Sequence, residues 1–371
     1  MAVHPYNGAM LVFFAFVVGA VVGSFLNVVV YRLPAGESVV HPPSRCPSCG
    51  HRLGPLDMVP ILSWLAFRGR CRYCGAPVSA RYPLVEALTG GLFALAAWLH
   101  PVPDVGLLLA WGFTALLIAL SFIDIDHYIL PDSLTYGGLA LGLLGAAIWA
   151  FPVGWSEAWQ GALAAAGLLA LIGGFANLVL RRGASGRPGF PVGLEHVYLA
   201  AAVAAWFGWG WGVLAAAAAV AVNLARRRPL PLPDALTLGA AVLGVLVASY
   251  GVLPLGVLES VWAMLLAAGA VALAGGLYWA LLPEEEEEEE DEEPVAMGFG
   301  DVKLAGMLGA WLGFGPFLVA LAVAVFAGAV LGLLFRRRKL PFGPYLALGG
   351  WVALWWGASW VQAYLAYLGL S

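Results

Sequence analysis

The sequence predicts an all-α polytopic membrane protein, a multi-helix transmembrane bundle with one small hydrophilic domain. Of its 371 residues 62% are hydrophobic and only 11% are charged, which lies outside the range of soluble globular domains. Apolar runs of about 20 residues, the length that crosses a bilayer core, recur along the chain. Four cysteines lie together in one polar stretch near the N-terminus. The first two observations indicate the bundle, and the third indicates the hydrophilic domain.

Apolar runs are evident at residues 10–30, 105–123, 134–151 and 158–180, and others follow to the C-terminus. We expect about 10 to 13 hydrophobic segments in all. The first run predicts a transmembrane helix over residues 8–31. No basic region precedes that run and it continues into the polar residues 24–27, so a cleaved signal peptide is not expected.

Basic residues predict the topology, because short cytosolic loops collect lysine and arginine. After the first run they are Arg32, Arg45, Arg52, Arg68, Arg70, Arg72 and Arg81. Later patches are Arg181, Arg182 and Arg187, then 226–228, then 336–339. The turns near Pro101, Pro152 and Pro254 lack them. The basic loops should therefore face the cytosol, with the N-terminus outside.

The polar stretch at 32–82 carries two Cys-x-x-Cys motifs, Cys46 with Cys49 and Cys71 with Cys74. Two such pairs can close a tetrahedral zinc site. All four ligands would come from the protein, which leaves no position for a catalytic water, so the zinc is expected to be structural. Two disulfides are the alternative, which a reducing cytosolic loop disfavours.

An internal duplication is suggested by two pairs of similar segments. Residues 129–135 resemble residues 231–237 at an offset of 102, and residues 193–200 resemble 298–305 at an offset of 105. In this alignment Asp124 corresponds to Arg226, and Asp301 corresponds to His196. Each copy therefore keeps one aspartate.

Asp124 is the first functional candidate, because a carboxylate at the end of a membrane helix is costly unless it faces water or a partner. Asp126 is its nearest rival, and Asp132 before Ser133 reads as a helix cap. Asp301 ends the Gly-Phe-Gly-Asp segment that opens at Gly298. Two carboxylates can hydrolyse a peptide bond together, one as base and one as acid.

Motifs for competing chemistry are missing from the sequence. It contains no Gly-x-Ser-x-Gly, no His-Glu-x-x-His and no Gly-x-x-x-x-Gly-Lys. The acidic run that begins at Glu284 reads as a solvated linker.

Five segments together resemble the bacterial type IV prepilin leader peptidases, which are GxGD membrane aspartyl proteases. They are Gly23–Asn27 with Tyr31–Pro34, the paired cysteine motifs, Arg81–Glu86, Asp124–Asp132 and Gly298–Asp301 with the Val-Lys-Leu that follows. The resemblance covers residues 8–140 and 295–335. It implies that Asp124 and Asp301 are the catalytic pair and that the four cysteines bind zinc.

The resemblance also implies two activities in the cytoplasmic (inner) membrane of a bacterium. The first removes the basic leader of prepilins and pseudopilins at the cytosolic face, and the second methylates the new N-terminus with S-adenosylmethionine. Asn27, Arg81 and Glu86 are candidates for the methyltransferase site, although Glu86 could instead be the ion-pair partner of Arg81. Membrane lipid and the assembly proteins of the pilus or of type II secretion are candidate partners; no nucleic acid is expected.

The predicted organisation follows from these motifs. It comprises a first transmembrane helix (8–31), the cytosolic zinc-binding loop with its four cysteines (32–82), a first part of the peptidase core (83–190), a degenerate repeat or inserted helices (191–283), an acidic linker (284–294) and a second part of the core (295–371). Residues 190–290 depart from the family pattern, since members pass directly from the Leu-Pro-Asp region through two spans to GxGD. An inserted bundle and a pseudo-symmetric pair of copies both remain open, as does a role for Glu195 or His196 opposite Asp124.

Two other functions stay open from the sequence. One is a peptidase without methyl transfer, and the other is a transporter or assembly protein, because internal repeats and acids in membrane helices also suit transporters. The segment 344–370 could cross once or fold as a hairpin.

Overall fold

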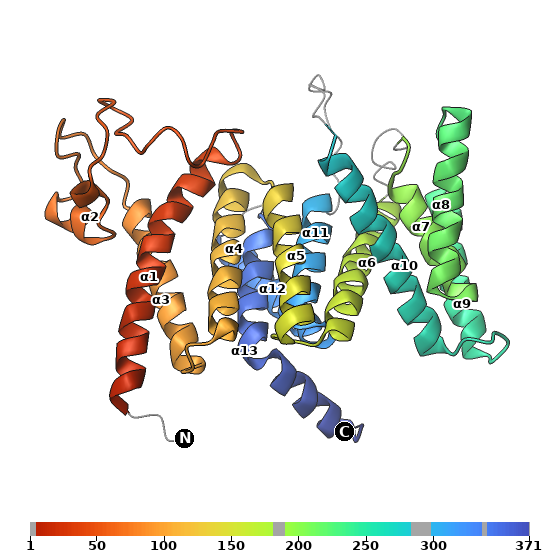
Figure 1. The fold of residues 1–371 in the computed structure, drawn as a ribbon. Coiled ribbons are helices and arrows are strands. Elements are labelled where there is room, and N and C mark those ends of the chain that lie inside the picture. Colours follow the sequence, from red (N-terminus) through yellow and green to blue (C-terminus); the bar gives the residue numbers. More distant parts are fainter. Residues whose placement is uncertain (1–4, 181–189, 283–297, 336–339, 371) are drawn as a thin grey trace. The chain divides into compact units, whose positions relative to one another are not determined.

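The computed structural model of the chain describes residues 5–180, 190–282, 298–335 and 340–370 (Figure 1). Within these ranges the regular structure is helical and no strand occurs, which confirms the predicted fold class; two isolated bridges lie in the cysteine-bearing loop. The predicted acidic linker at 284–294 and the basic residues 181, 182, 187 and 336–339 lie outside the described residues.

The helices follow one another in the order expected of a polytopic protein. They are α1 (Pro5–Arg32), the 3-10 helix η1 (Pro55–Met58), α2 (Leu62–Ala66), α3 (Arg81–Leu99), α4 (Val105–His127), α5 (Asp132–Trp149), α6 (Trp155–Val179), α7 (Leu194–Phe207), α8 (Trp209–Arg226), α9 (Asp234–Ser249), α10 (Val257–Ala280), α11 (Phe299–Leu312), α12 (Phe314–Phe335) and α13 (Gly343–Tyr367). Seven of the described helices, namely α1, α3, α4, α6, α8, α10 and α12, are long and apolar enough to cross a membrane.

The structure corrects the expectation for residues 134–151 and decides between the two alternatives for the C-terminal segment. The run at 134–151 forms α5, which is not among the seven candidate spans. The polar residues of its first turns, Asp132 above all, lower its mean hydropathy, although the segment forms a helix. The C-terminal segment forms the single helix α13 rather than a hairpin.

The described chain divides into two compact units. The first comprises Met1–Pro131 with Val323–Trp351, and the second comprises Asp132–Ala322 with Val352–Ser371. Asp124 and the cysteines belong to the first unit, and Asp301 belongs to the second.

In the first unit, glycines bring α1 and α3 close together. A Cβ added at Gly19 would lie 2.8 Å from the Cα of Gly90, and one at Gly23 would lie 2.8 Å from the Cα of Glu86. Small residues allow such backbone approach between membrane helices, where dispersion contacts provide much of the association energy. The α1/α3 pair is therefore a fixed frame from which the cysteine-bearing loop extends.

In the second unit, α6 and α10 cross at two glycines that are equivalent under the 102-residue offset. A Cβ at Gly167 would collide with the carbonyl oxygen of Leu265, and a Cβ at Gly269 would collide with that of Leu163. Each helix thus presents the same pair of positions to the other. This reciprocal contact is the arrangement that a two-fold related pair would give.

Two tryptophans on α7 and α11 make corresponding contacts with α9 and α5. The Trp206 indole Nε1 donates to the Ala240 carbonyl at 2.9 Å, and the Trp311 Nε1 donates to the Gly138 carbonyl at 2.8 Å. Trp206 also faces Gly244, as Trp311 faces Gly142. Thus α7 of the first predicted copy packs against α9 of the second, and α11 of the second packs against α5 of the first.

Candidate functional site

Asp124 lies in the last turn of α4, and its side chain is buried with 6% exposure. Its Oδ2 accepts a hydrogen bond of 2.9 Å from the backbone N–H of Gly343, the first residue of α13. A helix N-terminus favours a carboxylate because its N–H groups are unpaired and its dipole is positive. A Cβ at position 343 would lie only 2.6 Å from the same oxygen. Glycine at 343 is therefore what lets α13 begin on this carboxylate.

Asp126, the rival of Asp124, occupies a different environment. Its two oxygens pair with the two terminal nitrogens of Arg81, at 2.8 Å for Nη1 and 2.5 Å for Nη2. The Arg81 guanidinium also lies over the Phe122 ring, 5.1 Å from its centroid. Such a bidentate pair joins the start of α3 to the end of α4. The pairing accounts for Asp126 structurally and leaves Asp124 as the buried acid of this helix.

Asp301 lies in the first turn of α11, where Gly298 is the N-cap. Its backbone N–H bonds to the Gly298 carbonyl at 3.1 Å. Two residues further on, Lys303 Nζ bonds to the carboxylate of Asp132, the first residue of α5. Asp132 thus begins a helix, as its sequence context indicates, while its side chain holds the start of α11. That contact fixes the segment that carries Asp301.

The four cysteines form one cluster in the loop between α1 and α3. Their Sγ atoms all lie within 4.8 Å of one another, and all four thiols are free. The 3.9 Å between the Cys46 and Cys74 Sγ atoms is close to the about 3.8 Å between ligands of a tetrahedral zinc with Zn–S bonds of about 2.3 Å. The described residues therefore contain no disulfide, and the donor set fits a zinc ion.

Each Cys-x-x-Cys motif forms the same knuckle. Gly50 donates to the Cys46 carbonyl and Gly75 donates to the Cys71 carbonyl, both at 2.9 Å. Both glycines have positive φ, 70° and 72°, a backbone conformation that glycine adopts without steric cost. The N–H groups of Cys49 and Ser48 lower the pKa of the Cys46 thiol to about 6. A thiolate is the form that ligates metal.

Contacts outside the cysteines tie the loop together. Asp57 accepts a hydrogen bond from the Gly54 N–H and another from the Tyr73 hydroxyl, both at 2.9 Å, and these bonds lower the pKa of Asp57. The Trp64 indole donates to the Val78 carbonyl at 3.0 Å. The loop is thus organised by its own polar contacts, with little apolar core.

The three methyltransferase candidates lie at the junction of α1, α3 and this loop. Asn27 is buried, and its Nδ2 donates to the carbonyls of Gly23 and Tyr82 at 3.2 Å each. Glu86 is buried too, and its Oε2 accepts a 2.7 Å bond from the Ile61 N–H. Arg81 pairs with Asp126, so the alternative in which Glu86 is the ion-pair partner of Arg81 does not occur among the described contacts. Glu86 lies further along α3, where it faces the loop.

His196 is fully buried in the second unit. Its Nδ1 lies 3.1 Å from the Gly193 N–H, and its Nε2 lies 3.1 Å from Nδ2 of Asn223 on α8. Asn223 in turn accepts from the Leu230 N–H at 2.8 Å. The position that the predicted duplication aligns with Asp301 therefore belongs to a buried polar cluster.

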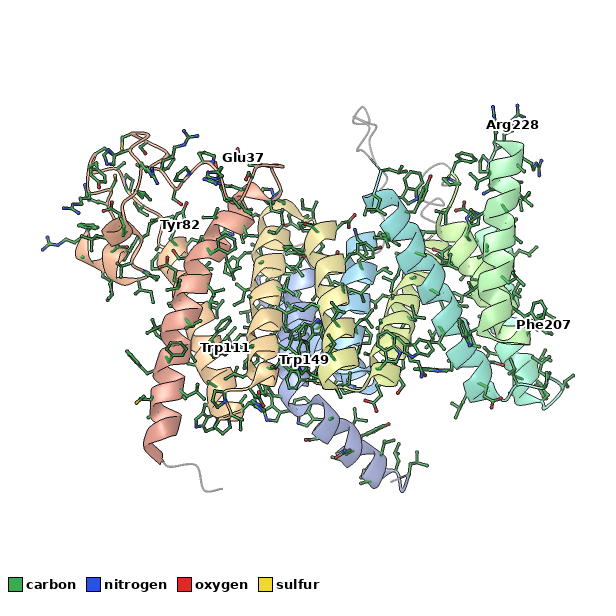
Figure 2. The ribbon with its side chains drawn as sticks, in the orientation of Figure 1. Glu37, Tyr82, Trp111, Trp149, Phe207 and Arg228 are labelled. Carbon is green, nitrogen blue, oxygen red and sulfur yellow. The ribbon has the colours of Figure 1, made fainter. Side chains whose placement is uncertain are left out.

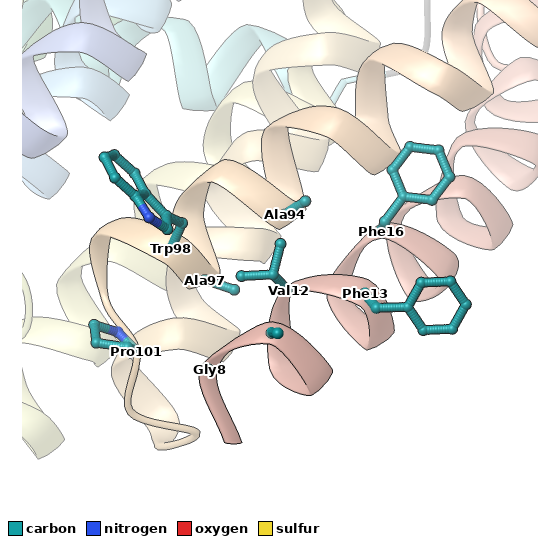
Figure 3. Close-up of a pocket in the computed structure, with 9 residues that line it drawn as sticks. Gly8, Val12, Phe13, Phe16, Ala94, Ala97, Trp98 and Pro101 are labelled. Carbon is teal, nitrogen blue, oxygen red and sulfur yellow. The ribbon is translucent and has the colours of Figure 1, made fainter. Parts of the chain in front are cut away.

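A groove of about 720 Å³ lies between α1 and α3 near Gly8 and Pro101 (Figure 3). Its lining is apolar, with Phe13, Phe16 and Trp98 among the large side chains. No titratable group lines it, so it offers no chemistry for hydrolysis.

Sequence reasoning missed Gly343 and Lys303. Both stand beside recognisable signals, since Gly343 precedes a proline at a helix start and Lys303 follows the Gly-Phe-Gly-Asp segment by two residues. Neither signal names the partner, because Asp124 and Asp132 lie 219 and 171 residues away along the chain.

Comparison with known proteins places the chain in a family. The model of the bacterial peptidase A24 N-terminal domain matches residues 17–100, and that of the type IV leader peptidase family matches residues 111–225 and 228–333. The chain therefore belongs to the type IV leader peptidase family, and the resemblance seen in its motifs is confirmed.

Individual relatives carry the name prepilin leader peptidase/N-methyltransferase. The Aeromonas hydrophila protein is 32% identical over 94% of this chain and 92% of its own length. The Pseudomonas aeruginosa protein is 28% identical over 100% of this chain and 98% of its own. The Myxococcus xanthus protein is 47% identical over 44% of this chain, and that match spans 48% of the relative. No solved structure gives a significant match.

Proposed function

We propose that the chain is a bifunctional enzyme that cleaves the leader of type IV prepilins and pseudopilins and then N-methylates the new N-terminus. The observation that carries the proposal is the buried Asp124 carboxylate at the end of a candidate span, bonded to the N-terminus of α13. Burying a carboxylate at the edge of a membrane costs free energy, so an acid in this position is by default a candidate functional residue. The family membership and the names of the relatives support the same reading.

The proposed peptidase is of the aspartic class, with Asp124 and Asp301 as its two acids. One carboxylate, acting as base, removes a proton from water, whose oxygen attacks the carbonyl carbon at the end of the leader. The other, acting as acid, protonates the leaving amine as the C–N bond breaks. The products are the free leader carboxylate and a pilin with a new amino group.

That amino group is the proposed methyl acceptor. S-adenosylmethionine would transfer its methyl group from the sulfonium sulfur to the deprotonated amine, leaving S-adenosylhomocysteine and a proton. Asn27, Arg81 and Glu86 remain the candidates for this site. Their support is their shared position, where α1, α3 and the cysteine loop meet.

A zinc ion held by Cys46, Cys49, Cys71 and Cys74 is proposed as a structural cofactor. The loop has few buried apolar residues, so a tetrahedral metal supplies the folding energy that a core would otherwise give. We place the loop and both aspartates at the cytosolic face of the inner membrane, on the strength of the arginines in 32–81. Lipid and pilus or secretion assembly proteins are the further proposed partners.

We also propose that α5 to α8 and α9 to α12 are the repeated helices of two copies of one unit, with Asp124 before the first set and its counterpart Arg226 before the second. The lengths of α5 to α8, which are 18, 25, 14 and 18 residues, are close to the 16, 24, 14 and 22 residues of α9 to α12. The reciprocal glycine contacts and the paired tryptophans support this proposal.

The aspartate assignment is tested with three variants of the full-length protein and a prepilin substrate. Asp124→Asn and Asp301→Asn should each abolish leader removal, because an amide can neither take nor give the required proton. Asp126→Asn is the matched control and should cleave. Mass spectrometry of the product reads the result. Full cleavage by either of the first two variants would overturn the catalytic pair.

The same assay separates the alternatives. Loss of the leader mass alone means a peptidase without methyl transfer, and an added methyl group that requires S-adenosylmethionine means both activities. Absence of any product together with indifference to both aspartates would favour a transporter or assembly protein.

A further inference from the structure

The loop contacts α3 at a strained turn centred on Ile61, the residue before α2. Ile61 has φ 62° and ψ −52°, and the Leu62 N–H bonds to the Pro60 carbonyl at 2.5 Å across it. This is the γ-turn with positive φ, a rare and strained conformation. For a β-branched residue a positive φ is a true outlier. Such a conformation persists only where its surroundings hold it.

The contact that holds the turn is the carboxylate of Glu86. Its Oε2 accepts the Ile61 N–H at 2.7 Å, although Glu86 is only 7% exposed. No ion pair of the described residues includes Glu86. A buried carboxylate without a cation is costly, so this single hydrogen bond to the strained turn is its main compensation.

Glu86 is itself held rigidly in place. Gly23 of α1 packs against its Cα, so closely that a Cβ at position 23 would lie 2.8 Å away. Four residues beyond Gly23, Asn27 bonds to the Tyr82 carbonyl one turn before Glu86. The carboxylate therefore stands at a fixed point of the α1/α3 frame.

We propose that Glu86 is a positioning residue that locks the cysteine-bearing loop onto the α1/α3 frame by holding the strained turn at Ile61. The hydrogen bond from Ile61 to Glu86 fixes the position of the loop relative to Asn27. The site for methyl transfer is complete only when the loop is in that position. This role rests on the proposed methyltransferase function and refines the part of Glu86 in it. The side chain acts through the Ile61 backbone and does not touch the methyl donor.

The test measures methyl transfer to a cleaved pilin by Glu86→Ala, Glu86→Gln and Glu86→Ala combined with Ile61→Gly. Glu86→Ala should lower the rate about tenfold, as the loss of one hydrogen bond to a charged group does. Glu86→Gln keeps an acceptor oxygen for the Ile61 N–H and should restore most of the rate. Glycine adopts positive φ without strain, so the double variant should also recover.

Ile61→Gly alone is the matched control and should methylate at the wild-type rate. Zinc content and protease sensitivity of residues 33–80 are measured in the same samples. In Glu86→Ala the loop should become more sensitive to protease while zinc stays bound. Leader removal in each sample reports that the membrane helices are folded.

Two results overturn the positioning role. If Glu86→Gln is as defective as Glu86→Ala, the charge itself takes part in binding or chemistry. If the double variant stays as slow as Glu86→Ala, the turn is not what Glu86 holds. Failure of the wild-type protein to methylate would contradict the proposed function instead, so the two failures are distinct.

Discussion

At the scale of single residues, buried polar side chains in this chain have specific backbone partners. The carboxylates of Asp124 and Glu86 accept hydrogen bonds from backbone N–H groups of Gly343 and Ile61. The amide of Asn27 donates to the Tyr82 carbonyl. A buried polar group without a partner costs free energy, and the cost is larger where water is excluded. Substitution at such positions should therefore separate side chains that serve the fold from those that serve chemistry.

His196 offers the clearest case of a buried polar residue that serves the fold. Replacing His196 with alanine leaves the Gly193 N–H without its partner and leaves Asn223 Nδ2 with the Pro191 carbonyl alone, which should cost about 1–3 kcal/mol. Thermal unfolding of the protein in detergent measures the change, with His41→Ala, at an exposed position, as the control. An unchanged unfolding temperature would mean that this cluster does not stabilise the second unit.

At the scale of helices, close crossings depend on glycine. Gly167→Ala and Gly269→Ala should both destabilise the protein, because each methyl group meets a carbonyl oxygen of the facing helix. The expected loss is about 1–3 kcal/mol, as for overpacked cores, and thermal unfolding measures it. The duplication predicts that both variants lose a similar free energy of unfolding.

Gly137 and Gly239 are matched controls on α5 and α9. A Cβ at either position meets no atom within 4 Å. Alanine there should be neutral or stabilising by about 0.5–1 kcal/mol, because alanine is the better helix former. Equal losses at all four glycines would show that the crossing is not the cause.

A few element boundaries carry local signals in the sequence. The flanking helices α1 and α3 end at Arg32 and begin at Arg81, and α5 and α9 begin at the aspartates of the two Pro-Asp pairs. The partners of Asp124 and Asp132 could not be predicted. The backbone N–H of Gly343 has no sequence signature, and a lysine such as Lys303 does not specify its carboxylate, because packing decides which helix ends meet.

The cysteine loop is an element whose stability should depend on metal. Strong chelation should leave the helices intact, since they are stabilised by their own packing, but should unfold residues 33–80. Limited proteolysis detects the loop and circular dichroism detects the helices. Cys46→Ser should give the same protease pattern without chelator. A chelated loop that stays resistant would mean that its hydrogen bonds alone fold it.

At the scale of the whole molecule, the distribution of arginine makes a prediction about membrane orientation. If each of α1 and α3 to α13 crosses the membrane, the chain alternates sides at every connection. The basic loops around residues 45 and 228 then share one side, and the turns near 101, 152 and 254 share the other. Figure 2 shows Arg228 and Phe207 at opposite ends of α8, as this alternation requires for that helix.

Reporter fusions test the alternation. A fluorescent protein that folds only in the cytosol should be active after residues 44, 228 and 340, and alkaline phosphatase, which needs the outside, should be active after residues 103, 153 and 253. The excess of lysine and arginine in cytosolic loops predicts which reporter should be active at each position. The helices α7 and α11 are the critical ones, because 14 residues span only about 21 Å of a core about 30 Å thick.

The two short helices have different consequences if they do not cross. Failure of α7 exchanges the sides of the reporters after 228, 253 and 340, and Asp124 and Asp301 then cannot both face the cytosol. Failure of α11 exchanges only the reporter after 340. If α11 does not cross, Asp124 and Asp301 remain on one side of the membrane, because Asp301 lies at the start of α11. The helices α12 and α13 would then run through the membrane in the opposite direction. Since Gly343 at the start of α13 bonds Asp124, such a reversal contradicts the observed contact, and we therefore expect α11 to cross despite its length.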